Sequence, residues 1–384
     1  MASTAKIEVK DNNQVAALQD FFKLLFAKQE ICGLLVSCHL SDRGNVMPCL
    51  LTDPENLDRA DPLAPVFPLN AAKLAAKLTN GQTGSMIAAV MRPCEIRAFI
   101  ELVKLNQGRL ENVLLIGFDC LGAFTRERYL KYIKEKDELQ ATLDFLQALN
   151  QISTDEQEPE EYEFLTRACK SCEYPLPAGA DLVLGYIGED MHRKILVQAD
   201  TARGEGLITR LGLADSDVPV RREKTIEEIK SKRRHYQENM FAETAEQTDS
   251  LQKLSSFLAF CVNCYNCRVA CPVCYCKECV FVTDVFDHKP FQYLGWARQK
   301  GALKLPADTL FYHLTRLAHI STSCVGCGQC SNACPNDVPV MELFKMVAAK
   351  TQKAFDYKAG EDPLQAPPLA VFQEQEFTEV TENE

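Results

Sequence analysis

The sequence lacks the marks of a membrane-spanning or secreted protein. No apolar run approaches the roughly 18 to 20 residues that a helix needs to cross a bilayer. The N-terminal residues MASTAKIEVKDNNQ are polar and contain neither the apolar core nor the cleavage site of a signal peptide. From these absences we expect a cytoplasmic protein with no membrane span.

The sequence also lacks an excess of positive charge. Its 53 aspartate and glutamate residues outnumber 42 lysine and arginine residues, for a formal net charge of -11. A chain of this charge argues against binding to nucleic acid or an anionic membrane surface. With 46% hydrophobic and 25% charged residues, the composition is that of a globular protein with a real core. Disordered and fibrous classes are therefore excluded.

Cysteine is the residue type present in excess. The 384 residues include 18 cysteines, of which seven precede residue 173 and eleven lie between Cys261 and Cys334. Thiols stay reduced in the cytoplasm, so dense cysteine there indicates metal binding or redox chemistry rather than a disulfide framework.

Two cysteine runs of identical spacing are the strongest motif. CVNCYNCRVACP begins at Cys261 and CVGCGQCSNACP begins at Cys324. This is the ligand spacing of two 4Fe-4S clusters, in which three closely spaced thiolates bind one cluster and the cysteine before proline binds the other. The predicted ligands of the first cluster are Cys261, Cys264, Cys267 and Cys334, and those of the second are Cys324, Cys327, Cys330 and Cys271.

Zinc is the alternative occupant of these runs. Tetrahedral zinc needs two C-x-x-C pairs and does not account for a third cysteine followed by C-P. The helical patterning between the runs favours an α-helical ferredoxin-like domain. Cys274, Cys276 and Cys279 have no place in the two-cluster scheme. They either hold a further metal, replace a predicted ligand, or are reduced thiols near a cluster.

The first part of the chain alternates helix and strand patterns. Apolar residues at helical spacing mark residues 15–28, 70–81 and 94–108, and short apolar runs at 31–40, 85–91 and 112–120 are typical of buried strands. The alternation predicts an α/β domain with a mostly parallel sheet. Residues 180–204 have the pattern of a strand hairpin.

A second cysteine set belongs to this α/β part. Cys94 and Cys120 each follow a predicted strand, at the carboxyl edge where such sheets bind ligands. Together with Cys169 and Cys172 they are candidates for a third cluster. The alternative is that the Cys169-x-x-Cys172 pair is a dithiol or half of a zinc site.

These patterns predict four segments. Residues 1–220 form the α/β domain, and residues 221–256 form a charged linker helix exposed to solvent. Residues 257–350 form the helical ferredoxin domain with two clusters. The acidic, proline-interrupted residues 351–384 form a tail that is disordered or lies on a partner subunit.

Four short motifs, in order, resemble a known family. They are Arg92-Pro93-Cys94-Glu95, Gly117-Phe118-Asp119-Cys120, Cys169-Lys170-Ser171-Cys172 and the stretch from Ala180 to Gly188. Together with the two cysteine runs they resemble the coenzyme F420 hydrogenase/dehydrogenase beta-subunit family, with the layout of the beta subunit of F420-dependent formate dehydrogenase. The resemblance covers most of residues 15 to 350.

The resemblance implies an iron–sulfur flavoprotein subunit of an oxidoreductase. It implies FAD that exchanges a hydride with F420 or NAD(P), and three 4Fe-4S clusters, one of them beside the flavin on Cys94, Cys120, Cys169 and Cys172. The implied partner is the catalytic subunit of a formate dehydrogenase, a hydrogenase or a heterodisulfide-reductase-like complex. Flavin suits this role because it converts a two-electron hydride into single electrons.

Candidate flavin contacts are Gly185, Gly188, Arg92 and Arg97, with turn glycines and surface arginines as the plain alternative. The chain differs from the family at Asp11–Val15, where members carry a glycine pair at the start of the first helix. That difference favours the alternative function, a flavin-free electron relay that only carries clusters and docks a partner. No acid–base or nucleophile constellation stands out, so we predict no catalytic residue.

Overall fold

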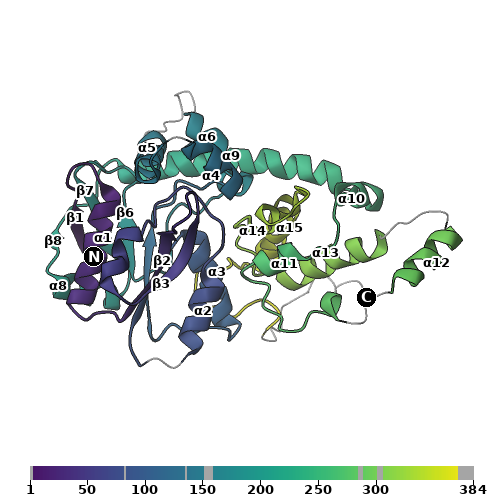
Figure 1. The fold of residues 1–384 in the computed structure, drawn as a ribbon, viewed down its shortest axis with the longest axis horizontal. Helices are drawn as coiled ribbons and strands as arrows, with labels where there is room; N and C mark the ends of the chain where they lie inside the picture. Colours follow the sequence, from purple (N-terminus) through teal and green to yellow (C-terminus); the bar gives the residue numbers. More distant parts are fainter. Residues whose placement is uncertain are drawn as a thin grey trace.

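An eight-stranded sheet forms the centre of the N-terminal half (Figure 1). The computed structural model describes residues 3–81, 84–134, 136–150, 159–283, 289–300 and 306–370. The strand order is β3-β2-β4-β5-β6-β7-β1-β8. The strands are β1 (Thr4–Glu8), β2 (Gly33–His39), β3 (Val46–Leu51), β4 (Ile87–Met91), β5 (Val113–Phe118), β6 (Leu182–Gly185), β7 (Lys194–Ala199) and β8 (Ala214–Asp215).

The sheet is mixed, so the prediction of a mostly parallel sheet is wrong. Strands β2, β4, β5 and β6 run parallel in the centre. Strand β3 pairs antiparallel with β2, and β7, β1 and β8 continue antiparallel beyond β6. Short connections join β2 to β3 and β6 to β7, whereas a parallel pair needs a long crossover. The predicted hairpin is confirmed by the β6–β7 register, in which Leu182 pairs with Ala199.

Helices cover both faces of this sheet. They are α1 (Gln14–Ala27), α2 (Ala72–Asn80), α3 (Pro93–Lys104), α4 (Arg126–Ile133), α5 (Glu138–Asn150), α6 (Glu160–Phe164), α7 (Arg167–Lys170) and α8 (Ala202–Leu211), with a 3-10 helix at Pro54–Arg59. Successive strand residues point to opposite faces. Leu114 and Ile116 therefore join one core cluster with α1 and α5, and Leu115 joins the other with α2 and α3.

The C-terminal half is helical among the described residues. Its helices are α9 (Arg222–Thr248), α10 (Leu251–Phe257), α11 (Asn266–Ala270), α12 (Pro290–Lys300), α13 (Pro306–Ile320), α14 (Gln329–Asn332) and α15 (Val340–Ala354), with a 3-10 helix at Val280–Val282. Helix α12 lies at the far end of this half from the sheet (Figure 1). The core cluster that contains α2 and α3 also contains Leu317 of α13 and Phe344 of α15, so the two halves share one apolar core.

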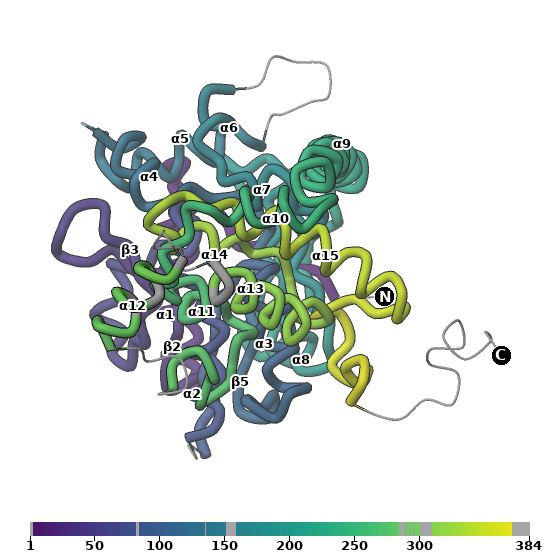
Figure 2. Tube along the Cα trace, turned by 90° about the vertical axis from the view of Figure 1, so that its right-hand side faces the viewer, coloured from purple at the N-terminus to yellow at the C-terminus, as the bar shows by residue number. Residues whose placement is uncertain are grey.

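Helix α9 spans both halves along one edge of the molecule (Figures 1 and 2). The sequence predicts a charged linker helix exposed to solvent here. Instead, one stripe of α9 is buried, because residues three and four positions apart share a helix face. The buried residues are Arg222, Ile226, Ile229, Arg233, Gln237, Met240 and Thr244.

The segment after α15 packs against α3. Arg97 Nε donates a hydrogen bond to the Ala359 carbonyl at 2.9 Å, and the Tyr357 hydroxyl donates to Glu101 Oε1 at 2.6 Å. The Gly360 N–H donates to the same Glu101 oxygen at 2.7 Å. Residues 371–384 of the predicted tail lie outside the described residues. Within the ranges that the structure describes, none of the helices has the length and apolarity required to cross a membrane.

Candidate metal centres

Four cysteines drawn from both runs line one small cavity, which we call the outer cavity. Cys261, Cys264 and Cys267 come from the first run, and Cys334 comes from the second. Short helix α11 carries Cys267, whose side chain is buried, whereas Cys264 is exposed to solvent. The outer cavity therefore reaches the protein surface on the side of Cys264.

A second cavity, the inner cavity, has the reverse composition. Cys324, Cys327 and Cys330 come from the second run, and Cys271 comes from the first. The two cysteines that precede proline thus exchange places between the cavities, in the arrangement that the spacing predicts. Four thiols around a space otherwise bounded largely by apolar side chains form a donor set that fits a 4Fe-4S cluster in each cavity.

The two runs repeat one backbone conformation. Asn263 and Tyr265 of the first run have φ angles of 53° and 59°, and Gly326 and Gly328 at the matching places have 67° and 79°. Residues of this left-handed conformation can turn successive N–H groups toward one side, which suits an anionic group. Glycine is needed at 328 because a side chain there would collide with Ala168 of α7.

One face of α13 contacts the first run. The Tyr312 hydroxyl lies 3.3 Å from Cys267 Sγ, and His313 Nε2 lies 3.4 Å from Cys261 Sγ. Arg316 Nη1 donates to Cys267 Sγ at 3.1 Å. Burial, and then the charge of Arg316, lower the pKa of His313 to about 4, so its imidazole is neutral at pH 7. Sequence reasoning missed these contacts, for which the three- and four-residue spacing on one helix was the available signal.

The structure brings the N-terminal cysteine set together at the carboxyl edge of the sheet. Cys94 lies in the first turn of α3, directly after β4, and Cys120 follows β5. Cys169 lies in α7, and Cys172 follows that helix. Burial raises the pKa of Cys120 to about 11; Arg92 opposes this shift, while the nearby thiols of Cys169 and Cys172 add to it.

Helix α9 supports this set from its buried stripe. Arg233 Nη2 donates to the Cys120 carbonyl at 3.0 Å. Gln237 Nε2 donates to the carbonyl of Ser171, between Cys169 and Cys172, at 3.2 Å. The predicted linker helix therefore holds the backbone of the cysteine set in place.

The N-terminal set adjoins the inner cavity. Burial, followed by the neighbouring thiol of Cys327, raises the pKa of Cys94 well above its ordinary value. Lys345 of α15 donates to Ser171 Oγ at 3.0 Å, and its side chain also packs against Gly326. The three cysteine groups therefore follow one another from the sheet edge through the inner cavity to the outer cavity.

Burial keeps several of these thiols protonated when they carry no metal. It raises the pKa of Cys324 to about 11, with the nearby Cys271 thiol adding to the shift. Burial likewise raises the pKa of Cys330 well above its ordinary value, although Arg316 opposes it. Because metals bind thiolates, loading these sites must release protons.

The cysteines do not converge on a single ion. Zinc would require four thiolates at about 2.3 Å from one centre. Among the described residues, no three histidine, cysteine or carboxylate side chains are placed to hold one metal ion. Cys274, Cys276 and Cys279 line neither the inner nor the outer cavity.

The two predicted flavin arginines are occupied by protein acceptors. Arg92 is buried, and its Nη2 donates to the carbonyls of Ala64 at 2.7 Å and Val66 at 3.2 Å. Arg97 is also buried, and it donates to the carbonyl of Ala359. Neither guanidinium fits the role of a flavin contact in this arrangement.

The two predicted flavin glycines pack against Arg222, the first residue of α9. A Cβ at Gly185 would lie 3.0 Å from the Arg222 guanidinium carbon. Gly188, at φ 73°, meets the Arg222 backbone. Gly188 also borders a cavity of about 1060 Å³, which Gly185, Arg92 and Arg97 do not line. The four predicted contacts therefore do not define one flavin pocket.

The 1060 Å³ cavity lies where family members carry the glycine pair. Asp11, Asn12 and Gln14 line it at the start of α1, and Arg221 and Lys224 line it at the start of α9. Asp11 and Asn12 have φ angles of 52° and 54°, so this turn is left-handed without glycine. The cavity wall here is polar and carries both signs of charge.

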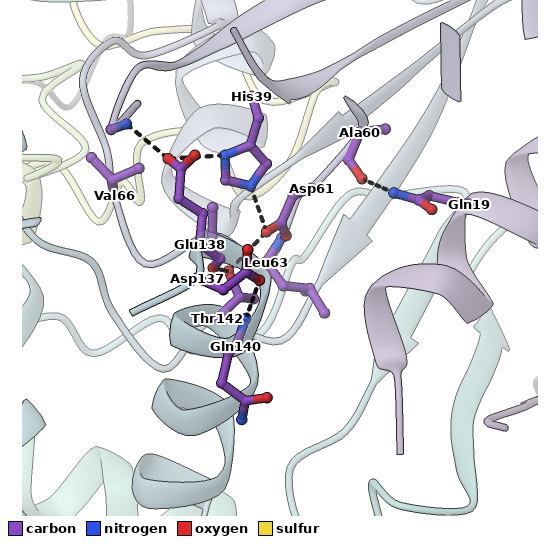
Figure 3. A network of polar contacts seen from close by, with 12 residues as sticks. Gln19, His39, Ala60, Asp61, Leu63, Val66, Asp137, Glu138, Gln140 and Thr142 are labelled. Atoms are coloured by element: carbon purple, nitrogen blue, oxygen red, sulfur yellow. Dashed lines mark hydrogen bonds and ion pairs between the residues drawn. The ribbon is translucent and has the colours of Figure 1, made fainter. Parts of the chain in front are cut away.

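A separate polar network joins β2 to α5 (Figure 3). His39 Nε2 lies 3.0 Å from Asp61 Oδ2, and His39 Nδ1 lies 3.4 Å from Glu138 Oε1. Thr142 donates to the same Asp61 oxygen at 2.8 Å. Burial lowers the pKa of His39, but the hydrogen bond and charge of Asp61, and then Glu138, outweigh it and raise that pKa overall.

Comparison with known proteins defines the class. Residues 257–338 match the family model described as "4Fe-4S dicluster domain". The chain is thus an iron–sulfur protein in which a mixed α/β region is joined to a dicluster domain. Residues 84–216 match the model for the C terminus of the coenzyme F420 hydrogenase/dehydrogenase beta subunit, and they belong to the family that the motifs predicted.

Two curated relatives extend the similarity over nearly the whole chain. The F420-dependent formate dehydrogenase subunit beta of Methanocaldococcus jannaschii is 28% identical over 377 residues, covering 92% of this chain and 93% of the relative. The F420-dependent formate dehydrogenase 1 subunit beta of Methanococcus maripaludis is 27% identical and covers 92% of both chains. The predicted resemblance is confirmed.

One solved structure has a weaker likeness. It is a chain of the F420-reducing [NiFe] hydrogenase complex from Methanosarcina barkeri, 12% identical, with a TM-score of 0.47 over 65% of this chain and 94% of that chain. No conclusion rests on so distant a match.

Proposed function

We propose that this chain is the electron-transfer subunit of a multi-subunit oxidoreductase and carries three 4Fe-4S clusters. The observation that carries the proposal is the exchange of Cys271 and Cys334 between the two cysteine cavities. A chance arrangement of thiols has no reason to cross in this way, whereas a two-cluster ferredoxin domain requires it.

The predicted ligands divide into three groups of four. When bound, each cluster accepts or donates one electron without breaking a bond. The outer cavity would use Cys261, Cys264, Cys267 and Cys334, the inner cavity would use Cys324, Cys327, Cys330 and Cys271, and the third site would use Cys94, Cys120, Cys169 and Cys172.

The protein orders these sites and encloses two of them. Lys345 and the close approach of Gly328 to Ala168 hold the inner cavity against the N-terminal set. The exposed Cys264 supports an exit for electrons at the outer cavity. Phe260 and Val262, on either side of Cys261, are 76% and 61% exposed, which supports contact with a partner protein there.

The partner follows from the relatives. Both are beta subunits of F420-dependent formate dehydrogenases, so the partner in our proposal is the catalytic subunit of a formate dehydrogenase, a hydrogenase or a heterodisulfide-reductase-like complex. Electrons would be exchanged with F420 or NAD(P) through FAD. The 1060 Å³ cavity at Gly188 is the place for a flavin in this finer form of the proposal.

The second candidate function is a flavin-free relay. It is favoured by the saturated hydrogen bonds of Arg92 and Arg97 and by the closure of Gly185 against Arg222. In this case the 1060 Å³ cavity holds no flavin, and the α/β region serves to carry one cluster and dock the partner.

Anaerobic purification tests both candidates. The proposal expects about twelve iron atoms and as many acid-labile sulfides per chain, with a broad visible absorption. Acid extraction then decides the flavin, since one flavin per chain supports the hydride-linked enzyme and its absence from iron-loaded protein leaves the relay. A colourless, zinc-containing preparation would refute the iron–sulfur function. Cys276→Ser is the matched control, because Cys276 is exposed and lines neither cavity.

A further inference from the structure

Arg316 is a buried cation that reaches both cysteine cavities from α13. Its side chain is 3% exposed. Its two terminal nitrogens donate to Cys267, to Sγ at 3.1 Å and to the carbonyl at 3.2 Å. The same side chain lines the inner cavity beside Cys271 and Cys330. Arg316 therefore touches a predicted ligand of one cluster and the wall of the other.

The surroundings of Arg316 supply no carboxylate among the described residues. Its guanidinium lies 4.7 Å from the ring centre of Phe344 and 5.4 Å from that of Tyr312, and its Nε has no hydrogen-bond partner. A buried charge is costly unless an opposite charge compensates it. The negative charges that act on it come from Cys267, Cys271, Tyr312 and Cys330.

We propose that Arg316 is the positive charge shared by both clusters of the dicluster domain and that it raises the reduction potential of each. This inference rests on the proposed function, since it needs clusters in both cavities. One-electron reduction adds one negative charge to a cluster. A fixed cation in a region of low dielectric stabilises that added charge and so favours the reduced form.

The position of Arg316 makes the effect common to both clusters. A residue that only held Cys267 in place would influence the outer cluster alone. A cation that also forms part of the inner cavity wall acts on the second cluster at similar range. Arg316 is thus a positioning and charge-compensating residue, and its signature is a paired change in two potentials.

Three variants separate charge from shape. Arg316→Gln keeps a hydrogen-bond donor without the charge, Arg316→Met keeps apolar bulk beside Phe344, and Arg316→Lys keeps the charge. The control is Arg298→Gln, because Arg298 is an exposed arginine on α12. Iron and sulfide content are measured first, and then the potential of each cluster is followed by electron paramagnetic resonance during a redox titration. Cys271→Ser and Cys334→Ser assign the two signals.

With full iron content, the neutral variants are expected to shift both potentials in the negative direction. Arg316→Lys should shift them less, and Arg298→Gln should leave them unchanged. Unchanged potentials, or a shift in only one cluster, would overturn the proposal. If both neutral variants lose iron, Arg316→Lys decides, because retained clusters support a charge requirement and lost clusters refute it. An iron-free unaltered protein would instead refute the proposed function itself.

Discussion

Arg222 Nη2 lies 2.8 Å from Asp119 Oδ1, in a buried ion pair between residues 103 positions apart. Asp119 follows β5 inside a family-like motif, and Arg222 begins α9. The Asp119 carboxylate also accepts the N–H groups of Tyr186 and Ile187, each at 2.9 Å. This carboxylate thus ties the start of the long helix to the ends of two strands.

Asp119→Asn is expected to destabilise the fold strongly. It leaves the Arg222 guanidinium buried without its charged partner, which costs about 3 to 5 kcal/mol. The measurement is the urea midpoint of unfolding by circular dichroism, compared at equal iron content because bound clusters complicate two-state unfolding. Glu127→Gln, which breaks the exposed pair with Lys131, is the control and should not move the midpoint. Equal midpoints for all three proteins would show that the buried pair is dispensable.

The crossed ligands make opposite losses expected from two matched variants. Cys334→Ser should remove the outer cluster and Cys271→Ser the inner one, each lowering the content by about four iron atoms per chain. Electron paramagnetic resonance should show a different signal missing in each case. Loss of the same signal from both variants would contradict the crossed assignment.

The stability of the β2–α5 network is expected to fall as the pH rises. The pKa of His39 is raised in the folded protein, so its contribution is fully present below the ordinary value of 6.5 and is lost as the pH rises through the raised value. The thermal midpoint of the unaltered protein should therefore approach that of His39→Gln across this range. His192→Gln, at an exposed position, should leave the pH profile unchanged. Parallel profiles for unaltered protein and His39→Gln would rule the network out as the cause.

Gly360→Ala is expected to loosen the C-terminal segment. Gly360 has a φ of 72°, and a side chain there would collide with the Arg97 backbone of α3. Backbone strain of this kind costs on the order of 1 to 3 kcal/mol. Limited proteolysis after α15 should accelerate, whereas Gly295→Ala, where a Cβ would meet no atom within 4 Å, should not change it. An unchanged cleavage rate for Gly360→Ala would mean that the segment is held by other contacts.

The features predictable from sequence are the local ones. Strands β2, β4 and β5 and helices α1, α2 and α3 follow from apolar spacing within each element, and the cysteine runs follow from their repeat. Strand β1 did not, because its pairing of Thr4 with Gln198 joins distant parts of the chain. The antiparallel flanks of the sheet depend on such pairings, which helix–strand alternation does not encode.

Side-chain roles that depend on tertiary packing were beyond the sequence. Arg97 had the features of a ligand-binding arginine beside a helix start, but its acceptor is the carbonyl of Ala359, 262 positions away. Arg316 gave no motif, because its contact with Cys267 arises only when α13 packs against the first cysteine run. In both cases the residue type was visible and its partner was not.

The docking of Tyr357 and Gly360 on Glu101 has a consequence for biosynthesis. Helix α3 is translated long before these partners emerge from the ribosome, so its buried carboxylate has to wait for nearly the whole polypeptide. A nascent chain halted before this point exposes an incomplete surface on its first folded part. Release of the finished polypeptide is therefore the step that completes the N-terminal half.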